Sequence, residues 1–215
     1  MTGLGYHETS DTELTLAVML RDAFTGRPSL RGPVNVRVAG VEEGWSKPLE
    51  STYLFFRLPA GPHSIEVESR SEPPLYQPVS FSVSLPATDP AWRAYPDRTL
   101  ADPAKSFDDA TQLPLFRSQF LNTCLLPTAA YEFPAGTSLI RGTVRNALGP
   151  LDGVSVRVTG ETRYVTTATG EYVVFLKSFL PSLNLEFSRG GYATQNVAVS
   201  VQAQSTTVIN VVMTP

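Results

Sequence analysis

Apolar and polar residues alternate in short runs along most of the chain, and glycine- and proline-rich segments separate the runs. The clearest run is 79–85, where Val, Phe, Val and Leu alternate with three serines. Alternation with a period of two predicts half-buried β-strands, and residues 14–20 and 34–38 show the same pattern. Helical periodicity is absent from residues 14–85, so the pattern predicts an all-β protein.

One of these runs occurs twice. Residues 34–40 read Val-Asn-Val-Arg-Val-Ala-Gly and residues 154–160 read Val-Ser-Val-Arg-Val-Thr-Gly, with five of seven positions identical and an offset of 120 residues (154 − 34). Nearby segments repeat in the same order: Tyr-Leu-Phe-Phe at 53–56 matches Tyr-Val-Val-Phe at 172–175. Likewise, the Ile-Glu-Val tripeptide beginning at residue 65 matches the Leu-Glu-Phe tripeptide beginning at residue 185. Matches in order are the signature of duplicated structural units.

The repeat and the strand spacing predict two tandem β-sandwiches. We expect a loose arm over 1–13, a first sandwich over 14–85 and a second over 139–215, each with seven antiparallel strands in a Greek-key arrangement. Short strands with turns every 8 to 12 residues or so are typical of such sandwiches. In the second unit the strands are expected at 139–145, 153–159, 162–167, 171–177, 183–188, 192–201 and 206–213.

Residues 86–138 have a different composition. They contain seven prolines, which disfavour long helices and central strands, but also many large apolar residues that need to be buried. We therefore predict a proline-rich, partly ordered connecting segment, irregular over 86–110. Over 111–138 we expect a strand or short helix that packs on the first unit or bridges the two. Long structured excursions are more often functional than not, so the aromatic residues here and in the first unit are candidate partner contacts. These candidates are Trp45, Trp92, Tyr95, Phe116 and Phe120.

Composition and charge narrow the class of partner. A hydrophobic content of 42% with 17% charged residues is typical of a folded globular protein, and a net charge of −3 gives no general attraction to nucleic acid or anionic membranes. The apolar run at 14–20 is too short to span a bilayer, and it follows an acidic stretch where a secretory signal would be basic. We expect a cytoplasmic protein without membrane insertion.

Catalytic and metal-binding patterns are absent from the sequence. The two histidines, His7 and His63, lie 56 residues apart, and a single cysteine, Cys124, leaves no zinc-ligand spacing. We expect both histidines to be exposed, Cys124 to be a buried and inert thiol among leucines, and Asp152 to be a solvated turn residue. The sequence also has no Gly-x-Ser-x-Gly elbow, so we predict no enzyme activity, no metal and no cofactor.

The second unit carries a family resemblance. A series of glycine-containing motifs resembles the carboxypeptidase regulatory-like domain over residues 139–213, and residues 14–85 resemble it more weakly through the repeat and Leu-Pro-Ala-Gly at 58–61. The family's usual Asp-x-x-Gly turn is Thr-Ala-Thr-Gly at 167–170 here. The resemblance implies a transthyretin-like seven-stranded sandwich that serves as a non-catalytic folding, spacer or adhesion module. The motifs are Ile140-x-Gly-x-Val144, Gly149-x-Leu-x-Gly-Val154, Val156-x-Val-x-Gly160, Thr167-x-x-Gly-Glu-Tyr172 and Gly191-Tyr192.

Two functional hypotheses follow. The first is a structural or adaptor protein that binds protein partners in a larger assembly built in the cytoplasm, such as an accessory component of a phage-tail-like contractile particle. A valine-rich edge at 208–213 could add a strand to a partner's sheet. The alternative is a carbohydrate- or surface-binding module that uses Trp45, Trp92 and Tyr95. An enzyme of the transthyretin-like fold is disfavoured, because its catalytic histidines have no counterpart.

Overall fold

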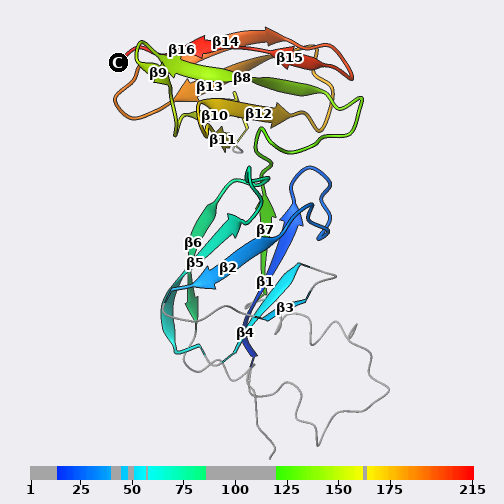
Figure 1. Ribbon diagram of the computed structural model, residues 1–215, viewed down its shortest axis with the longest axis vertical. Helices are drawn as coiled ribbons and strands as arrows, with labels where there is room; N and C mark the ends of the chain where they lie inside the picture. The colour runs from blue at the N-terminus through cyan, green and yellow to red at the C-terminus, as the bar shows by residue number, and fades with distance from the viewer. Residues whose placement is uncertain (1–13, 40–44, 48–50, 57, 86–119, 162–163) are drawn as a thin grey trace, which may run out of the picture. The chain divides into compact units, whose positions relative to one another are not determined.

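The computed structural model describes residues 14–39, 45–47, 51–56, 58–85, 120–161 and 164–215. The regular elements in these ranges are β-strands, as the alternation predicts, and none is a helix (Figure 1). Accordingly, these residues contain no helix that is long and apolar enough to cross a membrane.

The chain divides into two compact units that do not coincide with simple halves of the sequence. Unit 1 comprises Met1–Leu20, Val36–Glu66 and Ser80–Thr123, as far as these ranges are described. Unit 2 comprises Arg21–Asn35, Val67–Val79 and Cys124–Pro215. Unit 2 therefore combines two turn regions from the N-terminal part of the sequence with the entire C-terminal part.

The N-terminal strands form two sheets. One sheet has the order β3-β4-β1-β7 and the other the order β2-β5-β6. The inward faces are those that the alternation predicts: Leu16, Val18 and Leu20 are fully buried, and Val36 and Val38 are each 1% exposed. The strands are β1 (Leu14–Asp22), β2 (Val34–Val38), β3 (Trp45–Lys47), β4 (Thr52–Phe56), β5 (Gly61–Ser69), β6 (Val79–Leu85) and β7 (Phe120–Leu125).

Strand β7 lies within the proline-rich segment. It comes from the part of that segment where the sequence predicts a strand or short helix, and it is the neighbour of β1 in the four-stranded sheet. After β7 the chain continues to β8 without another strand, apart from a single β-bridge between Tyr76 and Pro127.

The C-terminal strands also form two sheets. One has the order β11-β10-β13-β14 and the other the order β12-β8-β15, with β9 and β16 also paired to β8. The strands are β8 (Leu139–Asn146), β9 (Gly149–Pro150), β10 (Ser155–Val158), β11 (Tyr164–Thr166), β12 (Glu171–Phe175), β13 (Ser182–Ser188), β14 (Gln195–Ser200), β15 (Thr206–Val208) and β16 (Val211–Val212).

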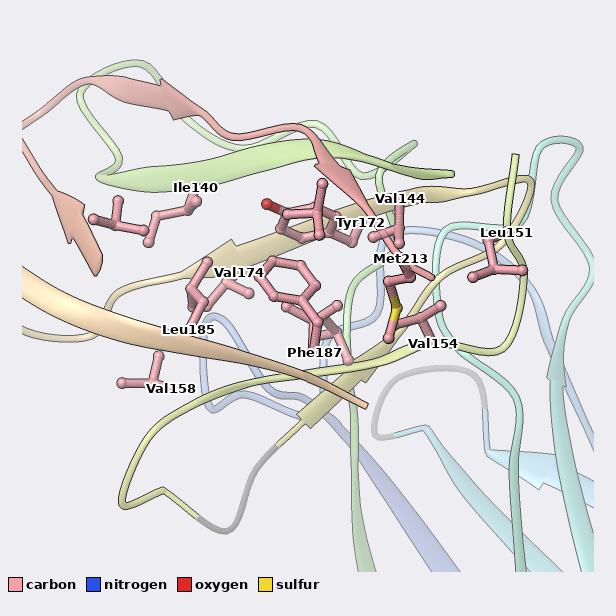
Figure 2. Packing of buried hydrophobic residues seen from close by; sticks show 14 of the residues in the cluster. Ile140, Val144, Leu151, Val154, Val158, Tyr172, Val174, Leu185, Phe187 and Met213 are labelled. Atoms are coloured by element: carbon pink, nitrogen blue, oxygen red, sulfur yellow. The ribbon is translucent and has the colours of Figure 1, made fainter. Parts of the chain in front are cut away.

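The core of the C-terminal sandwich lies between these two sheets. Ile140 and Val144 of β8 and Tyr172 of β12 face Leu185 and Phe187 of β13 (Figure 2). The rings of Tyr172 and Phe187 meet edge to face with their centroids 5.5 Å apart, a favoured arrangement for aromatic pairs. All five residues are at most 2% exposed, so the C-terminal strands enclose a core of their own.

The pairing of the last strands corrects the expectation of a wholly antiparallel sandwich. Strands β15 and β16 run parallel to β8, with Thr206 opposite Leu139 and Val211 opposite Val144. The preceding strand β14 belongs to the other sheet, so the chain crosses between layers before it reaches β8. A chain that crosses from one sheet to the other can enter the second sheet parallel or antiparallel to its neighbour. The alternation of apolar and polar residues within a strand does not indicate which of the two directions it takes.

Gly142 of β8 lies next to Ile209, the residue between β15 and β16. A Cβ atom on Gly142 would lie 1.7 Å from the Ile209 carbonyl oxygen, so only glycine fits there. The Tyr172 hydroxyl donates a hydrogen bond to the same oxygen at 2.8 Å. The Thr143 N–H instead donates to the Asn210 side-chain oxygen at 3.0 Å, so a side chain replaces one backbone bond of the ladder between β15 and β16.

The duplicated sequence has the same local structure in both places. In the C-terminal copy, Arg157 of β10 lies opposite Glu186 of β13, and their side chains form an ion pair at 2.7 Å. In the N-terminal copy, β2 neighbours β5, and Arg37 forms an ion pair with Glu66 at 3.6 Å. In each copy, the repeated Val-x-Val-Arg-Val run and the repeated glutamate therefore lie on neighbouring strands.

Candidate functional site: a buried carboxylate and two tyrosines

The most distinctive polar feature among the described residues is a carboxylate buried inside unit 2. Asp22 ends β1 and is 0% exposed. Its Oδ1 accepts hydrogen bonds from the backbone N–H groups of Phe24 at 2.7 Å and Thr25 at 3.1 Å. An aspartate side chain that accepts hydrogen bonds from the backbone N–H groups two and three residues later is typical of a turn.

The other carboxylate oxygen binds two tyrosines from distant parts of the chain. The Tyr76 hydroxyl donates to Asp22 Oδ2 at 3.0 Å, and the Tyr131 hydroxyl donates to the same oxygen at 2.5 Å. The tyrosine rings meet edge to face at 5.7 Å, and both residues are 1% exposed. Asp22, Tyr76 and Tyr131, here called the Asp22 cluster, thus join three segments separated by up to 109 residues.

Both tyrosines are held in the neutral, proton-donating form. Burial raises the pKa of Tyr76 to about 12; the Asp22 carboxylate raises it further, while a hydrogen bond from the Arg31 N–H opposes the rise. Burial also raises the pKa of Tyr131, and the hydrogen bond to Asp22 acts in the same direction. Hydrogen bonds to an ionised acceptor are roughly twice as strong as neutral ones, so the charge on Asp22 strengthens both contacts.

Aromatic side chains surround the Asp22 cluster and connect it to strand β12. Phe24 meets Tyr131, Phe133 and Phe175 edge to face, at centroid distances of 6.1, 5.1 and 5.5 Å. Phe175 of β12 is buried in a small apolar cluster that includes Ala23, with Phe24 and Phe133 packed against it. The turn after β1 and residues 126–138, here called the connector, therefore share one apolar layer with β12.

Two arginines fix the connector from either side. The Arg31 guanidinium lies 5.0 Å from the centre of the Tyr131 ring and donates a hydrogen bond to the Glu132 carbonyl oxygen. The Arg141 guanidinium donates to the carbonyl oxygens of Ala129 at 3.0 Å and Tyr131 at 3.2 Å. Together these contacts bind residues 129–132 through their backbone as well as their side chains.

Backbone bonds complete the attachment of the connector. The Gln77 N–H donates to the Leu126 carbonyl oxygen at 2.8 Å, and the Thr128 N–H donates to the Leu75 carbonyl oxygen at 3.0 Å. Such bonds resemble one step of a β-ladder and agree with the bridge beside them. Backbone hydrogen bonds thus hold segments 72–77 and 126–131 side by side, next to the Asp22 cluster.

The geometry of the Asp22 cluster suits a role in holding segments of the chain together better than a role in catalysis. Four donors fill the acceptor positions of the Asp22 carboxylate, and its complete burial keeps water and substrate away. A general base needs an open lone pair within reach of a substrate proton, which this carboxylate does not offer. Within the part of the chain that the structure describes, no group of three or more His, Cys, Asp or Glu residues could hold a metal ion.

The aromatic partner contacts expected from the sequence fall largely outside the described residues. Trp92, Tyr95 and Phe116 lie outside them altogether. Trp45 begins β3 and Phe120 begins β7, but their side chains are likewise outside what the structure describes. The structure therefore neither assembles these residues into a surface nor separates them, and their role stays a prediction.

Three expectations about single polar residues have different outcomes. His63 is 8% exposed rather than solvated, because it sits on the inward face of β5 and its Nε2 lies 2.7 Å from the Pro59 carbonyl oxygen. Cys124 is exposed rather than buried, because alternation along β7 turns Leu125 inward and Cys124 outward. Asp152 is an exposed turn residue, as expected, and accepts a hydrogen bond from the Gly170 N–H at 2.7 Å.

Sequence reasoning did not single out the residues of the Asp22 cluster. Asp22 lies at the start of a segment with ordinary turn residues, Tyr76 lies where the Gly-Tyr turn of the family is replaced by Pro-Leu-Tyr, and Tyr131 is one of the large apolar residues that need to be buried. No short motif links them, since their separations are 54 and 109 residues. The usable signal was the surplus of aromatic residues in a proline-rich segment, which indicates burial without naming the partner.

The motifs of the C-terminal part have specific structural roles. Like Gly142, the motif glycine Gly170 leaves no room for a side chain, because a Cβ there would lie 2.8 Å from the Val144 carbonyl oxygen. Its φ of +75° also favours glycine. Thr167 is buried, and its hydroxyl donates to the Leu151 carbonyl oxygen and accepts from the Val154 N–H. A buried threonine hydroxyl thus orders the turn where the usual motif has aspartate.

Comparison with known families agrees with these roles. Residues 139–214 match the family model of the carboxypeptidase regulatory-like domain, which confirms the resemblance over this part of the chain. Its members are non-catalytic modules with a transthyretin-like β-sandwich fold. No curated protein sequence matches the chain.

Several solved structures show a distant likeness. Two are complexes of a type II cohesin with an X-module and dockerin from Acetivibrio cellulolyticus, one a C-terminal and one an N-terminal interface mutant. Each is 16% identical with a TM-score of 0.31, over 35% of this chain and 56% of that chain. A third is the Bacillus anthracis TIE protein, 11% identical with a TM-score of 0.30, over 92% of this chain and 32% of that one. The match thus spans about half of each cohesin-complex chain and about a third of the TIE protein. Similarity with so low a sequence identity and TM-score does not indicate a shared function.

Proposed function

We propose that this protein is a non-catalytic structural adaptor that acts through protein–protein contacts. The observation that carries the proposal is the Asp22 cluster, a fully satisfied buried carboxylate that ties three distant segments to the C-terminal module. Buried polar networks of this kind rigidify a structure when every member is satisfied. A rigid attachment is what a spacer or adaptor needs in order to present its surfaces in a fixed way.

We further propose that the adaptor contains two tandem sandwiches. Equivalent strand orders support this, since β2-β5-β6 parallels β10-β13-β14 and β4-β1-β7 parallels β12-β8-β15. The ion pairs Arg37–Glu66 and Arg157–Glu186 occupy equivalent places in the two sheets. On this assignment β7 is the closing strand of the first sandwich, residues 86–119 are an insertion before it, and the connector between sandwiches is the short segment 126–138.

The partners of such an adaptor are other proteins of a larger assembly. The family of the C-terminal module, which consists of non-catalytic modules, supports this class of role. As the specific setting we propose an accessory component of a phage-tail-like contractile particle, assembled in the cytoplasm. Carbohydrate binding stays the alternative, and no described residue favours it.

Isolation of native complexes from the protein's own cells tests the proposal. The untagged full chain should co-purify in fixed proportion with structural subunits, and with sheath, tube or baseplate-like subunits if the particle assignment is right. A control isolation uses the Asp22→Asn variant, which should co-purify less because its connector is loosened. Recovery of the wild-type protein only as a lone monomer would contradict the assembly role.

A further inference from the structure

Strand β14 forms an open edge of the C-terminal sandwich. Among the described residues it pairs with β13 alone, at the end of the four-stranded sheet. The Val201 N–H donates to the Pro181 carbonyl oxygen at the end of this ladder, so the odd-numbered residues of β14 bond to β13. The backbone N–H and C=O groups of Asn196, Ala198 and Ser200 therefore point away from β13, and all three residues are exposed.

The other edges of the same sandwich are protected. At the edge of β11, the Gln77 side-chain amide binds both outward backbone groups of Thr166. In β12, Val173 is buried beside the connector, and the outward groups of Glu171 bond to Ala168. Strands β9, β15 and β16 are each only two or three residues long. Covered edges and very short edge strands are means by which proteins prevent pairing with other chains.

Strand β14 lacks these protections. It has six residues in continuous register with β13, and none of them is charged or a proline. Contacts to the end of the chain stop before its outward groups begin: the Ala193 N–H donates to the Thr214 carbonyl oxygen, and the Gln195 amide donates to the Val212 carbonyl oxygen. An uncharged, regular and exposed edge strand is a template for pairing with another strand.

We propose that β14 binds the β14 strand of a second copy of this chain. The two strands run antiparallel about a two-fold axis at Ala198, which lies opposite Ala198 of the second copy. Asn196 then lies opposite Ser200 of the second copy, and the reverse pair forms on the other side of the axis. In this register each outward N–H meets an outward carbonyl oxygen, so backbone hydrogen bonds form along the whole open stretch.

The sequence of β14 matches itself in this register. Residues 196–200 read Asn-Val-Ala-Val-Ser, which is nearly symmetric about Ala198. On the outer face, the smallest side chain of the stretch meets itself, and Asn196 can form a hydrogen bond with the Ser200 hydroxyl. On the inner face, Val197 lies opposite Val199 of the second copy, a favourable pair of β-branched side chains. No like charges meet, because the strand carries none.

Two large apolar side chains lie near one end of this edge. Phe179 and Leu180 are exposed just before Pro181, whose carbonyl oxygen binds the residue that follows β14. The two-fold axis places one such pair near each end of the joined strands. An interface of this size lies below about 1,200 Å², so we expect weak association with a Kd of about 10 µM to 1 mM. Self-pairing adds a contact between copies to the adaptor role and does not depend on it.

Sedimentation equilibrium of the full chain between about 5 µM and 1 mM tests the self-pairing. Ala198→Lys places two lysines opposite each other and should weaken dimerisation at least about tenfold. Ala198→Pro should do the same, because it removes an outward N–H without removing a bond to β13. The control is Asn184→Lys, at an exposed position of β13 opposite Ala198 in the same chain, which should stay within about twofold of the wild type. An unchanged urea midpoint shows that each variant is folded.

A charge exchange identifies the occupant of the edge. Ala198→Glu alone should dimerise as poorly as Ala198→Lys, because like charges again lie on the axis. An equimolar mixture of Ala198→Lys and Ala198→Glu should associate about as tightly as the wild type, since opposite charges then face each other across the pair. Only pairing of residue 198 with its own copy predicts this recovery.

Three results would overturn self-pairing: a wild-type monomer up to about 1 mM, a dimer that neither Ala198→Lys nor Ala198→Pro weakens, or no association in the charge-exchange mixture. A monomeric protein that loses its co-purified structural subunits in Ala198→Lys would assign β14 to a different protein and would also overturn it. Self-association without co-purified structural subunits would support self-pairing and contradict the adaptor role, so the two failures are distinguishable.

Discussion

Removal of the Asp22 carboxylate should strongly destabilise unit 2. In Asp22→Ala, the hydroxyls of Tyr76 and Tyr131 lose their acceptor, and both residues are 1% exposed. Each buried polar group left unsatisfied costs about 1–3 kcal/mol, so the two hydroxyls together cost about 2–6 kcal/mol. The N–H groups of Phe24 and Thr25 add less, because these residues are part-exposed or exposed and water can reach them.

Asp22→Asn should cost less than Asp22→Ala. Asparagine keeps the shape of the side chain and, at Oδ1, the acceptor for the two backbone N–H groups. An NH2 group replaces Oδ2, so the two tyrosine hydroxyls lose the acceptor for their protons and can only accept hydrogen bonds from residue 22. We expect a loss of about 1–3 kcal/mol in the free energy of unfolding, the scale of hydrogen bonds to charged groups. Against a total stability of about 5–15 kcal/mol, both variants give measurable shifts.

Urea unfolding followed by circular dichroism measures these losses. A compensated variant, Asp22→Leu with Tyr76→Phe and Tyr131→Phe, serves as the control, because replacing every polar partner by an apolar group should recover much of the stability lost in Asp22→Ala. A stability of Asp22→Asn equal to that of the wild type would refute the reasoning. So would a compensated variant no more stable than Asp22→Ala.

Three further predictions concern other parts of the chain. Gly142→Ala should cost more than about 3 kcal/mol or prevent folding, because its Cβ would lie 1.7 Å from a backbone oxygen; a urea midpoint within error of the wild type would contradict this. Stability should fall as pH rises from about 10 towards 12, because folded Tyr76, with a pKa of about 12 instead of 10.0, keeps a proton that the unfolded chain loses; thermal melts across this range test it, and Tyr76→Phe should flatten the dependence. A double-mutant cycle on Arg157 and Glu186 should give a coupling of at most about 1 kcal/mol that shrinks in high salt, since Arg157 is partly exposed; a larger, salt-independent coupling would argue against a surface ion pair.

The sequence predicts those features of the fold that depend on neighbouring residues. The alternation at 34–38 and 79–85 identifies strands and their inward faces, because a strand turns successive side chains to opposite faces. The repeat identifies equivalent strands, and the two arginine–glutamate pairs follow from it. In each case the information lies within a few residues of the position concerned.

Features that depend on distant residues were not predicted. The parallel direction of β15 and β16 depends on a crossover between layers, and the Asp22 cluster depends on three segments that meet only in the folded chain. Cys124 shows the same limit on a smaller scale, since leucine neighbours indicate a strand but not which of its faces is covered.

Hydrogen exchange at the connector tests the central claim most directly. In wild type, amides of residues 126–133 should be protected, because the Asp22 cluster, Arg141 and the backbone bonds to segment 72–77 hold this stretch. Under native conditions, Asp22→Asn should speed exchange there and at residues 23–25 by at least about tenfold, with little change in β13 and β14. A control variant of similar overall stability, Val199→Ala in the core of the C-terminal sandwich, should not single out the connector. Unchanged protection of residues 126–133 in Asp22→Asn would contradict the account.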